Sequence, residues 1–386
     1  MVTVRYFIFL SLISACAVGQ VIQTTALTDS LEEVSGMAAR GDYIWMINDS
    51  GNEPFLFEYK GVNYQGAYYI EAQNRDWEAL TLDLMGNLYI GDIGNNANNR
   101  GTREIYRINV SDLNHTFDTI TPERIPYSTP VQPPYPDAKR DYDWESLIWY
   151  AGQFHVFSKN RREPFDGKLI HFSTSAQFEK ADTFQIEDST VLGAIVRELY
   201  WVTDATISLD RRHLFLLSSD KIIAYFDFPG TRFFEGYKVT MPLGTIAQHE
   251  AIAAWNDTLL LMADEQTPLG GRSLKVFDFS DELEDYLEDR RGEVSIDTKK
   301  IDSTVVLTIE PVVTTRVVLE IFDDSGHKVR EILLGEAPAD TVTSYTVDLT
   351  DLPTGMYILN VLCGRVPHGY FVVKPGVYDP NNQSNE

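Results

Sequence analysis

The sequence is poor in cysteine, with only Cys16 and Cys363 among its 386 residues. Small secreted domains that depend on covalent cross-links are dense in cysteine, so a disulfide-rich scaffold is excluded. Hydrophobic residues make up 44% of the chain and aromatic residues 12%, which is enough for a packed core. Stability must therefore come from packing, or from a bound metal, rather than from disulfides.

Basic side chains are also scarce. The 32 Lys and Arg residues are outnumbered by 57 Asp and Glu residues, which gives a formal net charge of −25. A charge of this size and sign repels phosphate backbones and anionic lipid headgroups. We therefore expect no nucleic-acid partner, whereas a cationic small molecule or a metal-bridged anion fits the charge.

Long hydrophobic runs are missing as well. The N-terminal apolar run Tyr6–Ile13 is too short to span a bilayer stably, so we expect no transmembrane segment. Arg5 precedes this run and small residues follow it, which is the order of a secretory signal. Ala17 and Gly19 suit the −3 and −1 positions of a cleavage site, so the sequence predicts a signal peptide over residues 1–19.

An alternative for the N-terminus is a lipobox. Ile13–Cys16 resembles one, and Cys16 would then be lipidated and become the first mature residue. Both alternatives predict a protein that is secreted or held on the cell surface.

Common catalytic motifs are absent too. The sequence has no serine-nucleophile elbow, no HExxH zinc helix, no phosphate-cradling P-loop and no dinucleotide fingerprint. What the sequence does contain is an internal repeat.

The repeat occurs five times and consists of a carboxylate, a small residue, an alternating apolar strand, a polar turn and a second apolar strand. Ser replaces the carboxylate in the first copy. The strand starts are Ser35-Gly36, Glu78-Ala79, Glu145-Ser146, Asp204-Ala205 and Glu250-Ala251. Each copy predicts a β-hairpin followed by further strands, and sheets of about four strands repeated along one chain are typical of a β-propeller. We therefore expect an all-β propeller over residues 20–280.

The number of blades follows less directly from the repeat. The first four copies have an apolar segment suited to a fourth strand, but the fifth runs into an acidic stretch. Val21–Ala26, which precedes the first repeat, could supply the missing strand and close the ring. Five blades are favoured on this pattern, and six remain possible.

The repeat also predicts where the carboxylates lie. In an antiparallel hairpin the start of the first strand and the end of the second lie at the same edge. We therefore expect Glu78 opposite Asp92 and Glu250 opposite Asp264. Constant spacing likewise pairs Ser35 with Asp49, Glu145 with Lys159 and Asp204 with Ser219. Seven carboxylates would then converge on one mouth of the channel.

So many like charges at one mouth need neutralising, because close carboxylates repel each other. Hard divalent cations such as Ca²⁺ take six to eight oxygen ligands, so we expect the mouth to hold one. The expected metal ligands are Glu78, Glu145, Asp204, Glu250, Asp92 and Asp264. The alternative is that these residues are solvated strand ends that cap backbone amides and bind nothing.

Two functions fit such a mouth. One is extracellular recognition of a cationic or metal-bridged ligand. The other is metal-dependent hydrolysis of lactones, esters or phosphoesters, for which His249 or Glu250 is a candidate general base. His249 could equally be a partner for a neighbouring carboxylate. Trp77 and Trp144, which precede column carboxylates, could stack on a ligand or pack between blades.

Three segments carry a resemblance to known proteins, namely Asn74–Leu80, Gly91–Asn95 and Val202–Ala205. They resemble a poorly characterised group of exported bacterial propellers. More remotely, the carboxylate-then-small strand starts look like those of esterase-like phytase, strictosidine-synthase-like and lactonase propellers. Several of those hold Ca²⁺ in the channel, which is what the resemblance implies here.

The C-terminal region resembles the type IX secretion (Por) sorting domain of Bacteroidetes. The resemblance rests on Val318–Val329, Leu349–Tyr357 and Phe371–Lys374, although the Pro-Asn-Pro run common in such domains is absent. It implies an Ig-like β-sandwich over residues 301–374 and the secretion machinery as a partner. Residues 281–300 are expected to be a charged linker, and 375–386 a tail.

Overall fold

The structure, a computed structural model, describes residues 20–374 except 98–99, 116–117, 131–141, 177–181, 194–195, 269, 292, 302 and 365. The expected signal peptide with Cys16 and the expected tail over 375–386 therefore lie outside the described residues. The chain forms two compact units, which divide between Glu282 and Leu283. Among the described residues, none of the helices has the length and apolar character needed to cross a membrane.

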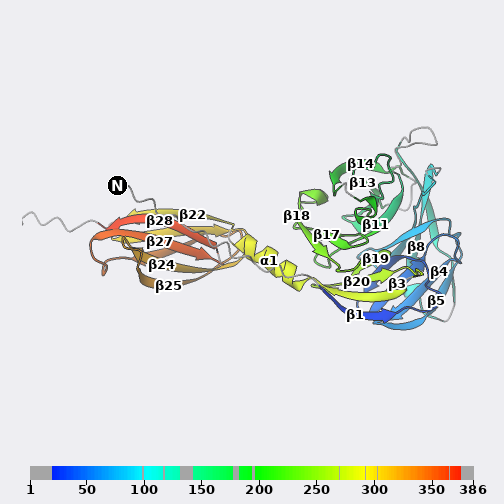
Figure 1. Ribbon diagram of the computed structural model, residues 1–386, viewed down its shortest axis with the longest axis horizontal. Helices are drawn as coiled ribbons and strands as arrows, with labels where there is room; N and C mark the ends of the chain where they lie inside the picture. Colours follow the sequence, from blue (N-terminus) through cyan, green and yellow to red (C-terminus); the bar gives the residue numbers. More distant parts are fainter. Residues whose placement is uncertain are drawn as a thin grey trace, which may run out of the picture. The chain divides into compact units, whose positions relative to one another are not determined.

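The N-terminal unit consists of sheets that follow one another along the chain and are antiparallel except where β9 joins the first (Figure 1). The first sheet contains β2 (Val34–Arg40), β3 (Tyr43–Asn48), β4 (Phe55–Lys60) and β5 (Asn63–Ile70), with the short β9 (Thr119–Ile120) at its edge. The second contains β6 (Trp77–Leu82), β7 (Asn87–Asp92), β8 (Thr102–Asn109) and β10 (Glu123–Ser128).

Three more sheets complete this unit among the described residues. The third contains β11 (Trp144–Tyr150), β12 (Gln153–Ser158), β13 (Lys168–Ser175) and β14 (Gln185–Val191). The fourth contains β15 (Asp204–Ile207), β16 (His213–Leu217), β17 (Lys221–Phe226) and β18 (Tyr237–Pro242). The last contains β19 (His249–Ala254), β20 (Leu259–Asp264), β21 (Ser273–Asp278) and β1 (Gln20–Ala26).

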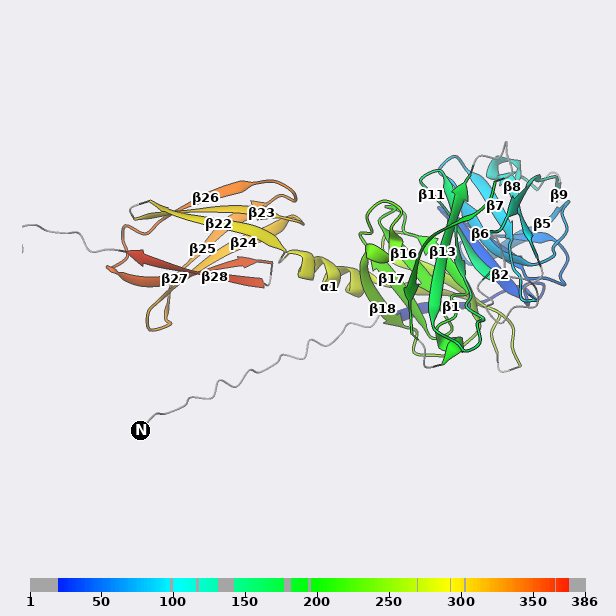
Figure 2. The same cartoon turned by 90° about the horizontal axis from the view of Figure 1, so that it is seen from above.

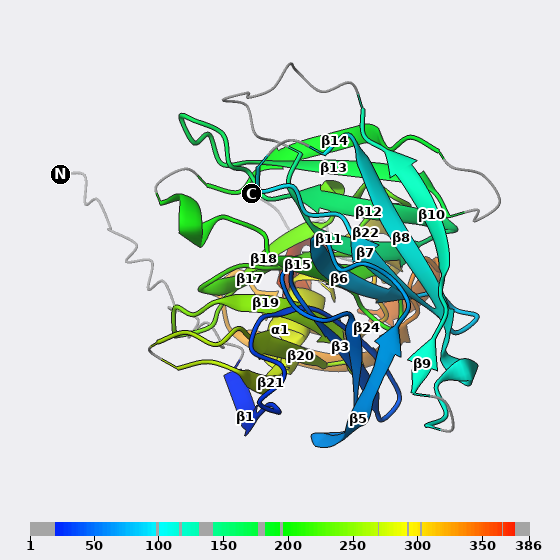
Figure 3. The ribbon, with the colours of Figure 1, turned by 90° about the vertical axis from the view of Figure 1, so that its right-hand side faces the viewer.

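The first strands of the five sheets form a closed ring. β2 contacts β6, β6 contacts β11, β11 contacts β15, β15 contacts β19, and β19 contacts β2 again. Figure 3 shows β6, β11, β15 and β19 near the centre, with the later strands of each sheet farther out. This arrangement is a β-propeller, so the predicted all-β propeller fold is confirmed.

The ring is closed by the N-terminal strand. β1 pairs antiparallel with β21, from Gln20 opposite Asp278 to Ala26 opposite Ser273. The last sheet therefore takes its outer strand from the start of the described chain, as the sequence predicted for Val21–Ala26 (Figure 3).

Small residues bring the innermost strands close together. Ala79, Ser146 and Ala251 are fully buried, as is most of Ala205. Gly36 shows why the column is small, because a Cβ added there would lie 2.7 Å from the backbone nitrogen of Leu80. These residues form a close-packed waist, and the two ends of the channel lie on either side of it.

The two tryptophans before the column carboxylates belong to the core. Trp77 and Trp144 are completely buried, Trp77 with Tyr106 and Trp144 with Phe172 and Phe184. Packing, rather than stacking on a ligand, is therefore their role.

The C-terminal unit has two antiparallel sheets (Figure 2). One sheet contains β22 (Val294–Ile301), β23 (Thr304–Pro311) and β26 (Thr343–Asp348), and the other contains β25 (Lys328–Ala337), β24 (Thr315–Asp323), β27 (Gly355–Cys363) and β28 (Val366–Lys374). Alternate residues of both sheets, such as Leu307, Leu319 and Leu359, share one buried core. Cys363 is a free, buried thiol in that core.

The prediction of a linker over residues 281–300 is wrong, because this segment has regular secondary structure. Ser280–Arg291 forms the helix α1, and β22 begins at Val294 and is a full strand of the C-terminal unit. The physical reason is visible in the sequence, because acidic residues occupy the first turn of α1 and Arg290 and Arg291 the last, which complements the helix dipole.

Candidate functional site

A β-bulge recurs at the start of the innermost hairpins. In four of them the register shifts across one residue, which is Ser35, Glu78, Glu145 or Glu250. A bulge leaves the extra residue unpaired and re-aims its side chain. All four of these residues line one cavity at the channel mouth.

The bulge corrects the strand pairing predicted from constant spacing. Trp77, not Glu78, lies opposite Asp92, and His249, not Glu250, lies opposite Asp264. In the same way Val34 pairs with Asn48 and Trp144 with Ser158. Asp204 pairs with Leu217 rather than Ser219, in a hairpin that has no bulge. A single inserted residue shifts the register by one, and that decides which side chains face the channel.

The cavity at this mouth has a volume of about 210 Å³. Carboxylates dominate its lining, and we call it the acidic mouth. It is lined by Glu33, Val34, Ser35, Asp49, Glu78, Asn96, Glu145, Lys159, Arg161, Gln248, Glu250 and Glu265.

A tight group of three carboxylates lies at one side of the acidic mouth, with Asp49 and Glu78 in its lining and Asp76 beside them. Asp49, Asp76 and Glu78 each offer an oxygen within 4.8 Å of the others. Glu78 is only 4% exposed, and it makes no hydrogen bond or ion pair with any described residue. Burial, and then repulsion from Glu145, Asp49 and Asp76, raises the pKa of Glu78 well above its usual value.

The carboxylates near Glu78 also have raised pKa values. Burial, with repulsion from Asp49 and other carboxylates, raises the pKa of Asp76 to about 6. Burial, with repulsion from Glu250 and Glu33, raises the pKa of Glu265 to about 7. The pKa values of Asp49 and Glu250 are also raised, mainly by burial. This side of the mouth therefore favours either protons or an added cation.

The backbone around the group is held in place. The side-chain amide of Asn74 donates to the carbonyl of Asn48 at 3.0 Å and to that of Asp49 at 2.8 Å, and its oxygen accepts from the N–H of Trp77 at 3.1 Å. The loop after β7 covers the other side, where a Cβ on Gly94 would lie 2.5 Å from the carboxylate of Asp76. The three carboxylates are thus fixed by elements of two sheets.

The other side of the mouth is neutralised internally. Glu145 pairs with Lys159 at 3.1 Å and with Arg161 at 3.4 Å, and Arg161 also pairs with the buried Asp143. Burial nevertheless raises the pKa of Glu145, against the pull of Lys159. Of the predicted ligands, Glu145 is therefore on the cavity but already has cationic partners.

Asp204 is not part of the acidic mouth, which corrects the prediction. It is fully buried and does not line the cavity. Its Oδ1 accepts the N–H of Ala205 and its Oδ2 accepts the N–H of Ile252 on the neighbouring innermost strand, both at 2.8 Å. Asp204 joins two strands of the ring, which is the capping role that the sequence left open.

Asp92 and Asp264 are also displaced from the cavity that was expected to use them. Asp92 is fully buried and pairs with Arg100 at 2.7 Å. Asp264 pairs with Lys275 at 2.5 Å and accepts the hydroxyl of Ser273 at 2.8 Å. Neither lines the acidic mouth, and each is buried beside a cationic partner.

The candidate general base His249 is buried beside Asp264. It is 1% exposed, its Nδ1 lies 2.5 Å from Oδ1 of Asp264, and it does not line the cavity. It is therefore a partner for a neighbouring carboxylate, whereas Glu250 does line the cavity.

Three carboxylates in or beside the acidic mouth were not identified from the sequence. Glu265 and Glu33 follow or precede predicted positions by one or two residues, and Asp76 lies two residues before Glu78. Asp76 precedes β6 and lies outside the repeated column, so the repeat gave no signal for it. The spacing of the repeat predicted Asp264 at the mouth, and nothing in it indicated that Glu265 would line the cavity instead.

No family model matches the sequence, and no curated protein matches it. Solved structures with some likeness include the Cps50 (Swd1) β-propeller domain of Myceliophteria thermophila, at 9% identity and a TM-score of 0.38, covering 67% of this chain and 99% of that chain. Virginiamycin B lyase from Staphylococcus aureus with quinupristin matches at 10% identity and a TM-score of 0.33, covering 91% and 98%.

A third structure is PorZ, a surface component of the type-IX secretion system of Porphyromonas gingivalis. It matches at 12% identity and a TM-score of 0.29, covering 88% of this chain and 51% of that chain. The chain thus spans about half the length of PorZ. Likenesses this weak carry no information on activity, ligand or partner.

Proposed function

We propose that this protein is an exported recognition propeller that binds a divalent cation, Ca²⁺ in the first instance, at its acidic mouth. The cation is held by Asp49, Asp76 and Glu78. The observation that carries the proposal is that Glu78 is buried and has no partner among the described residues, next to two more carboxylates within 4.8 Å.

The chemistry of these ligands suits a hard cation. Carboxylate oxygens are what Ca²⁺ prefers, and waters complete its coordination at an open mouth. A cation placed there offsets the repulsion that raises the pKa values of Asp76 and Glu78. On the other side, Lys159 and Arg161 offset the charge of Glu145. Arg100 lies 3.9 Å from Asp76 and offsets its charge only in part, since the pKa of Asp76 stays raised.

The rest of the mouth is then available to a ligand. Glu250 and Glu265 line the cavity beyond the cation site, so an amine-bearing ligand finds acceptors there. An anionic group can bridge to the bound cation. Recognition of either kind needs no covalent step, and it fits a chain without common catalytic motifs.

The test is cation binding by the metal-free protein, measured by calorimetry and by thermal unfolding with Ca²⁺. A cation at about a hundredfold excess over its Kd adds about 2.7 kcal/mol to the free energy of unfolding. We expect this response in the wild type and its loss in Glu78→Gln and in Asp76→Asn. Glu235→Gln is the matched control, since Glu235 is 55% exposed and pairs with Arg232 outside the mouth.

The proposal fails if wild-type protein stripped with chelator shows no response to millimolar Ca²⁺, Mg²⁺ or Mn²⁺. It also fails if Glu235→Gln removes the response as fully as Glu78→Gln does, because the effect would then be one of net charge.

A metal-dependent hydrolase is the second candidate function, and the position of Glu250 supports it. Glu250 lines the cavity, and burial raises its pKa, as a general base at neutral pH requires. Assays on lactone, aryl-ester and phytate substrates with and without Ca²⁺ decide between the two. Turnover that is lost in Glu250→Gln would make the protein an enzyme, whereas binding without turnover supports recognition.

Export is the third part of the proposal and rests on the sequence. The N-terminal signal features and the resemblance of residues 301–374 to a sorting domain support passage to the cell surface through type IX secretion. Intact-mass analysis of the native protein tests this. A mature chain beginning at Gln20 and lacking the C-terminal unit supports the proposal, and a periplasmic protein that retains it contradicts the sorting role.

A further inference from the structure

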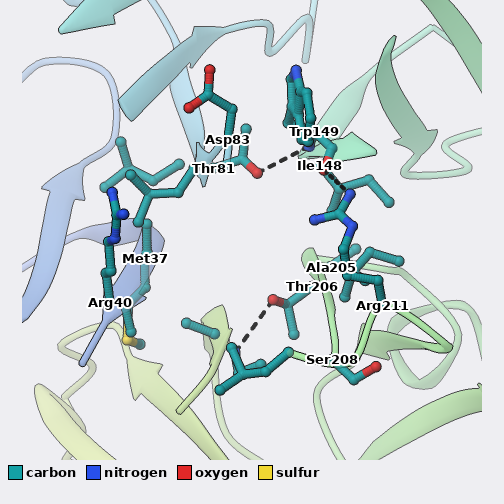
Figure 4. Close-up of a pocket in the computed structure, with 18 of the residues that line it drawn as sticks. Met37, Arg40, Thr81, Asp83, Ile148, Trp149, Ala205, Thr206, Ser208 and Arg211 are labelled. Carbon is teal, nitrogen blue, oxygen red and sulfur yellow. Dashed lines mark hydrogen bonds between the residues drawn. The ribbon is translucent and has the colours of Figure 1, made fainter. Parts of the chain in front are cut away.

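A second cavity lies at the opposite end of the same channel (Figure 4). Its volume is about 230 Å³, and it is lined by later residues of β2, β6, β11 and β19, whose first residues line the acidic mouth, and by residues of β15. The waist of small residues stands between the two cavities. Because Arg40 and Arg211 are its charged lining residues without a carboxylate partner, we call this cavity the arginine mouth.

The charge of the arginine mouth is opposite to that of the chain. Arg40 makes no hydrogen bond or ion pair with a described residue, and Arg211 makes no ion pair with one. The one carboxylate in the lining, Asp83, is used by its own turn. It accepts from the N–H groups of Met85 and Asn87, both at 2.8 Å, and from the hydroxyl of Tyr89 at 3.0 Å. In a protein of net charge −25, this leaves two cationic side chains that no carboxylate of the described residues pairs with, and the lining carries one more positive than negative charge.

Arg211 is held in one position. Its guanidinium lies over the rings of Trp149, at 5.2 Å, and of Tyr150, at 4.8 Å, and one nitrogen donates to the carbonyl of Trp149 at 3.2 Å. Burial lowers its pKa without removing its charge at neutral pH. One hydrogen bond uses only part of the donor fork, so the guanidinium can still bind a planar anion through two N–H groups.

Most of the residues that line the cavity are apolar, with a few polar side chains among them. Figure 4 shows Arg40 and Met37 on one side of the opening and Ile148, Trp149 and Arg211 on the other. The polar atoms of the wall are engaged within it, as with the hydroxyl of Thr81, which accepts the N–H of Trp149 at 3.0 Å. Apolar walls with a few fixed polar groups are typical of small-molecule sites.

We propose that the arginine mouth binds a small organic anion with a flat apolar body, such as an arylalkanoate. Its carboxylate pairs with Arg211, its ring lies against Ile148 and Trp149, and Arg40 adds attraction from across the opening. The volume of about 230 Å³ is below the roughly 300–1,000 Å³ of drug-sized sites, which limits the ligand to a single ring with a short chain. This site is independent of the cation at the acidic mouth.

The experiment uses the full-length protein labelled with 5-fluorotryptophan, whose Trp149 resonance is assigned with Trp149→Phe. Benzoate, phenylacetate and 3-phenylpropanoate are titrated to about 10 mM, ten times a Kd of about 1 mM. Phenethylamine and 2-phenylethanol are the matched cationic and neutral probes. We expect at least one of the acids to shift the Trp149 resonance and to bind at least tenfold more tightly than either matched probe.

Variants of two adjacent arginines separate the site from a general charge effect. Arg211→Gln should weaken binding at least tenfold, and Arg211→Lys should weaken it less, because it keeps the charge but loses the fork. Arg212→Gln is the matched control, since Arg212 is 62% exposed and pairs with Asp227, and it should leave the affinity unchanged.

The proposal is overturned if none of the three acids shifts Trp149, or if phenethylamine or 2-phenylethanol binds as tightly as the best acid. Equal losses in Arg211→Gln and Arg212→Gln would overturn it as well. If Arg211→Gln does not fold, Arg211→Lys is compared with Arg212→Gln instead, and equal affinities of these two variants would overturn the proposal.

Discussion

The two mouths of the channel share four innermost strands, β2, β6, β11 and β19, and the arginine mouth also uses β15. They differ in charge and in the groups that offset that charge. The acidic mouth lies at the strand starts, where bulges turn Glu78, Glu145 and Glu250 toward the cavity. The arginine mouth lies at the strand ends, where pairing is regular and the one carboxylate, Asp83, is engaged by its own turn.

The difference teaches that a bulge can change the environment of a side chain without changing the strand around it. With regular pairing, a carboxylate at a strand end is satisfied by nearby backbone N–H groups, as Asp83 is. With a bulge, Glu78 is removed from such donors and is buried among like charges. The hydrogen bonds of Asp83 stabilise the fold. The carboxylates around Glu78 repel each other, and a bound cation would reduce that repulsion.

Substitution of Asp204 should have the largest effect on the free energy of unfolding, and it tests whether Asp204 supports the fold rather than the cation site. Asp204→Ala leaves the N–H groups of Ala205 and Ile252 buried without acceptors, at about 1–3 kcal/mol each, so the free energy of unfolding should fall by about 2–6 kcal/mol. Urea unfolding measures this. Asp204→Asn keeps one acceptor and should lose less, with Ca²⁺ affinity unchanged. Loss of Ca²⁺ binding in Asp204→Asn without loss of stability would restore Asp204 to the cation site.

Lys159→Met should have the next largest effect, because it removes a cationic partner of Glu145 in the acidic mouth. Glu145 is 3% exposed in its side chain, and breaking a buried pair costs about 3–5 kcal/mol. Arg161 remains as a partner, so we expect the lower end of that range in urea unfolding. Calorimetry should show tighter Ca²⁺ binding, since a positive charge has left the cavity. Weaker Ca²⁺ binding would mean that Lys159 positions the carboxylates rather than opposing a cation.

The pH dependence of the acidic mouth should be a smaller effect with a definite sign. The pKa values of Asp76, at about 6, and of Glu265, at about 7, lie above those of the unfolded chain, so the folded protein binds more protons between about pH 4 and 7. Without metal, this mouth should therefore become more stable as the pH falls from 8 to 5. Its Ca²⁺ response should shrink over the same range, because protons occupy the ligands.

The control for this prediction is the difference between wild type and Glu78→Gln at each pH, measured by thermal unfolding. Burial lowers the pKa of His155 to about 3, so His155 destabilises the folded state as the pH falls below about 6.5, with the opposite sign. That contribution is common to both proteins and cancels. A Ca²⁺ response that grows between pH 8 and pH 5 would contradict the assignment of the ligands.

The smallest effect should come from Arg40 at the arginine mouth. Arg40 is exposed, so Arg40→Gln should change the free energy of unfolding by no more than about 0.5 kcal/mol. Because exposed charges interact weakly, phenylacetate affinity should fall only about threefold, well short of the loss in Arg211→Gln. The same fluorine titration measures it. A larger loss for Arg40 than for Arg211 would move the anchoring role to the opposite wall.

Much of the fold followed from the sequence alone, because the repeat marks each innermost hairpin by a small residue and a polar turn. The starts of β6, β11, β15 and β19 lie within one residue of the predicted positions. The helix α1 was missed although its end charges indicate it, since a charged stretch without strong apolar periodicity resembles a linker.

The sequence by itself determined that carboxylates recur at the strand starts and that they lie at one end of a ring, because both follow from the repeat and from hairpin geometry. Only the tertiary structure decided what each carboxylate meets. Bulges shifted the register so that Glu78 and Glu250 face the cavity while Asp92 and Asp264 do not. The partner of Asp204 is a backbone N–H of another sheet, at Ile252, and such a contact between residues distant in the chain leaves no trace in local spacing.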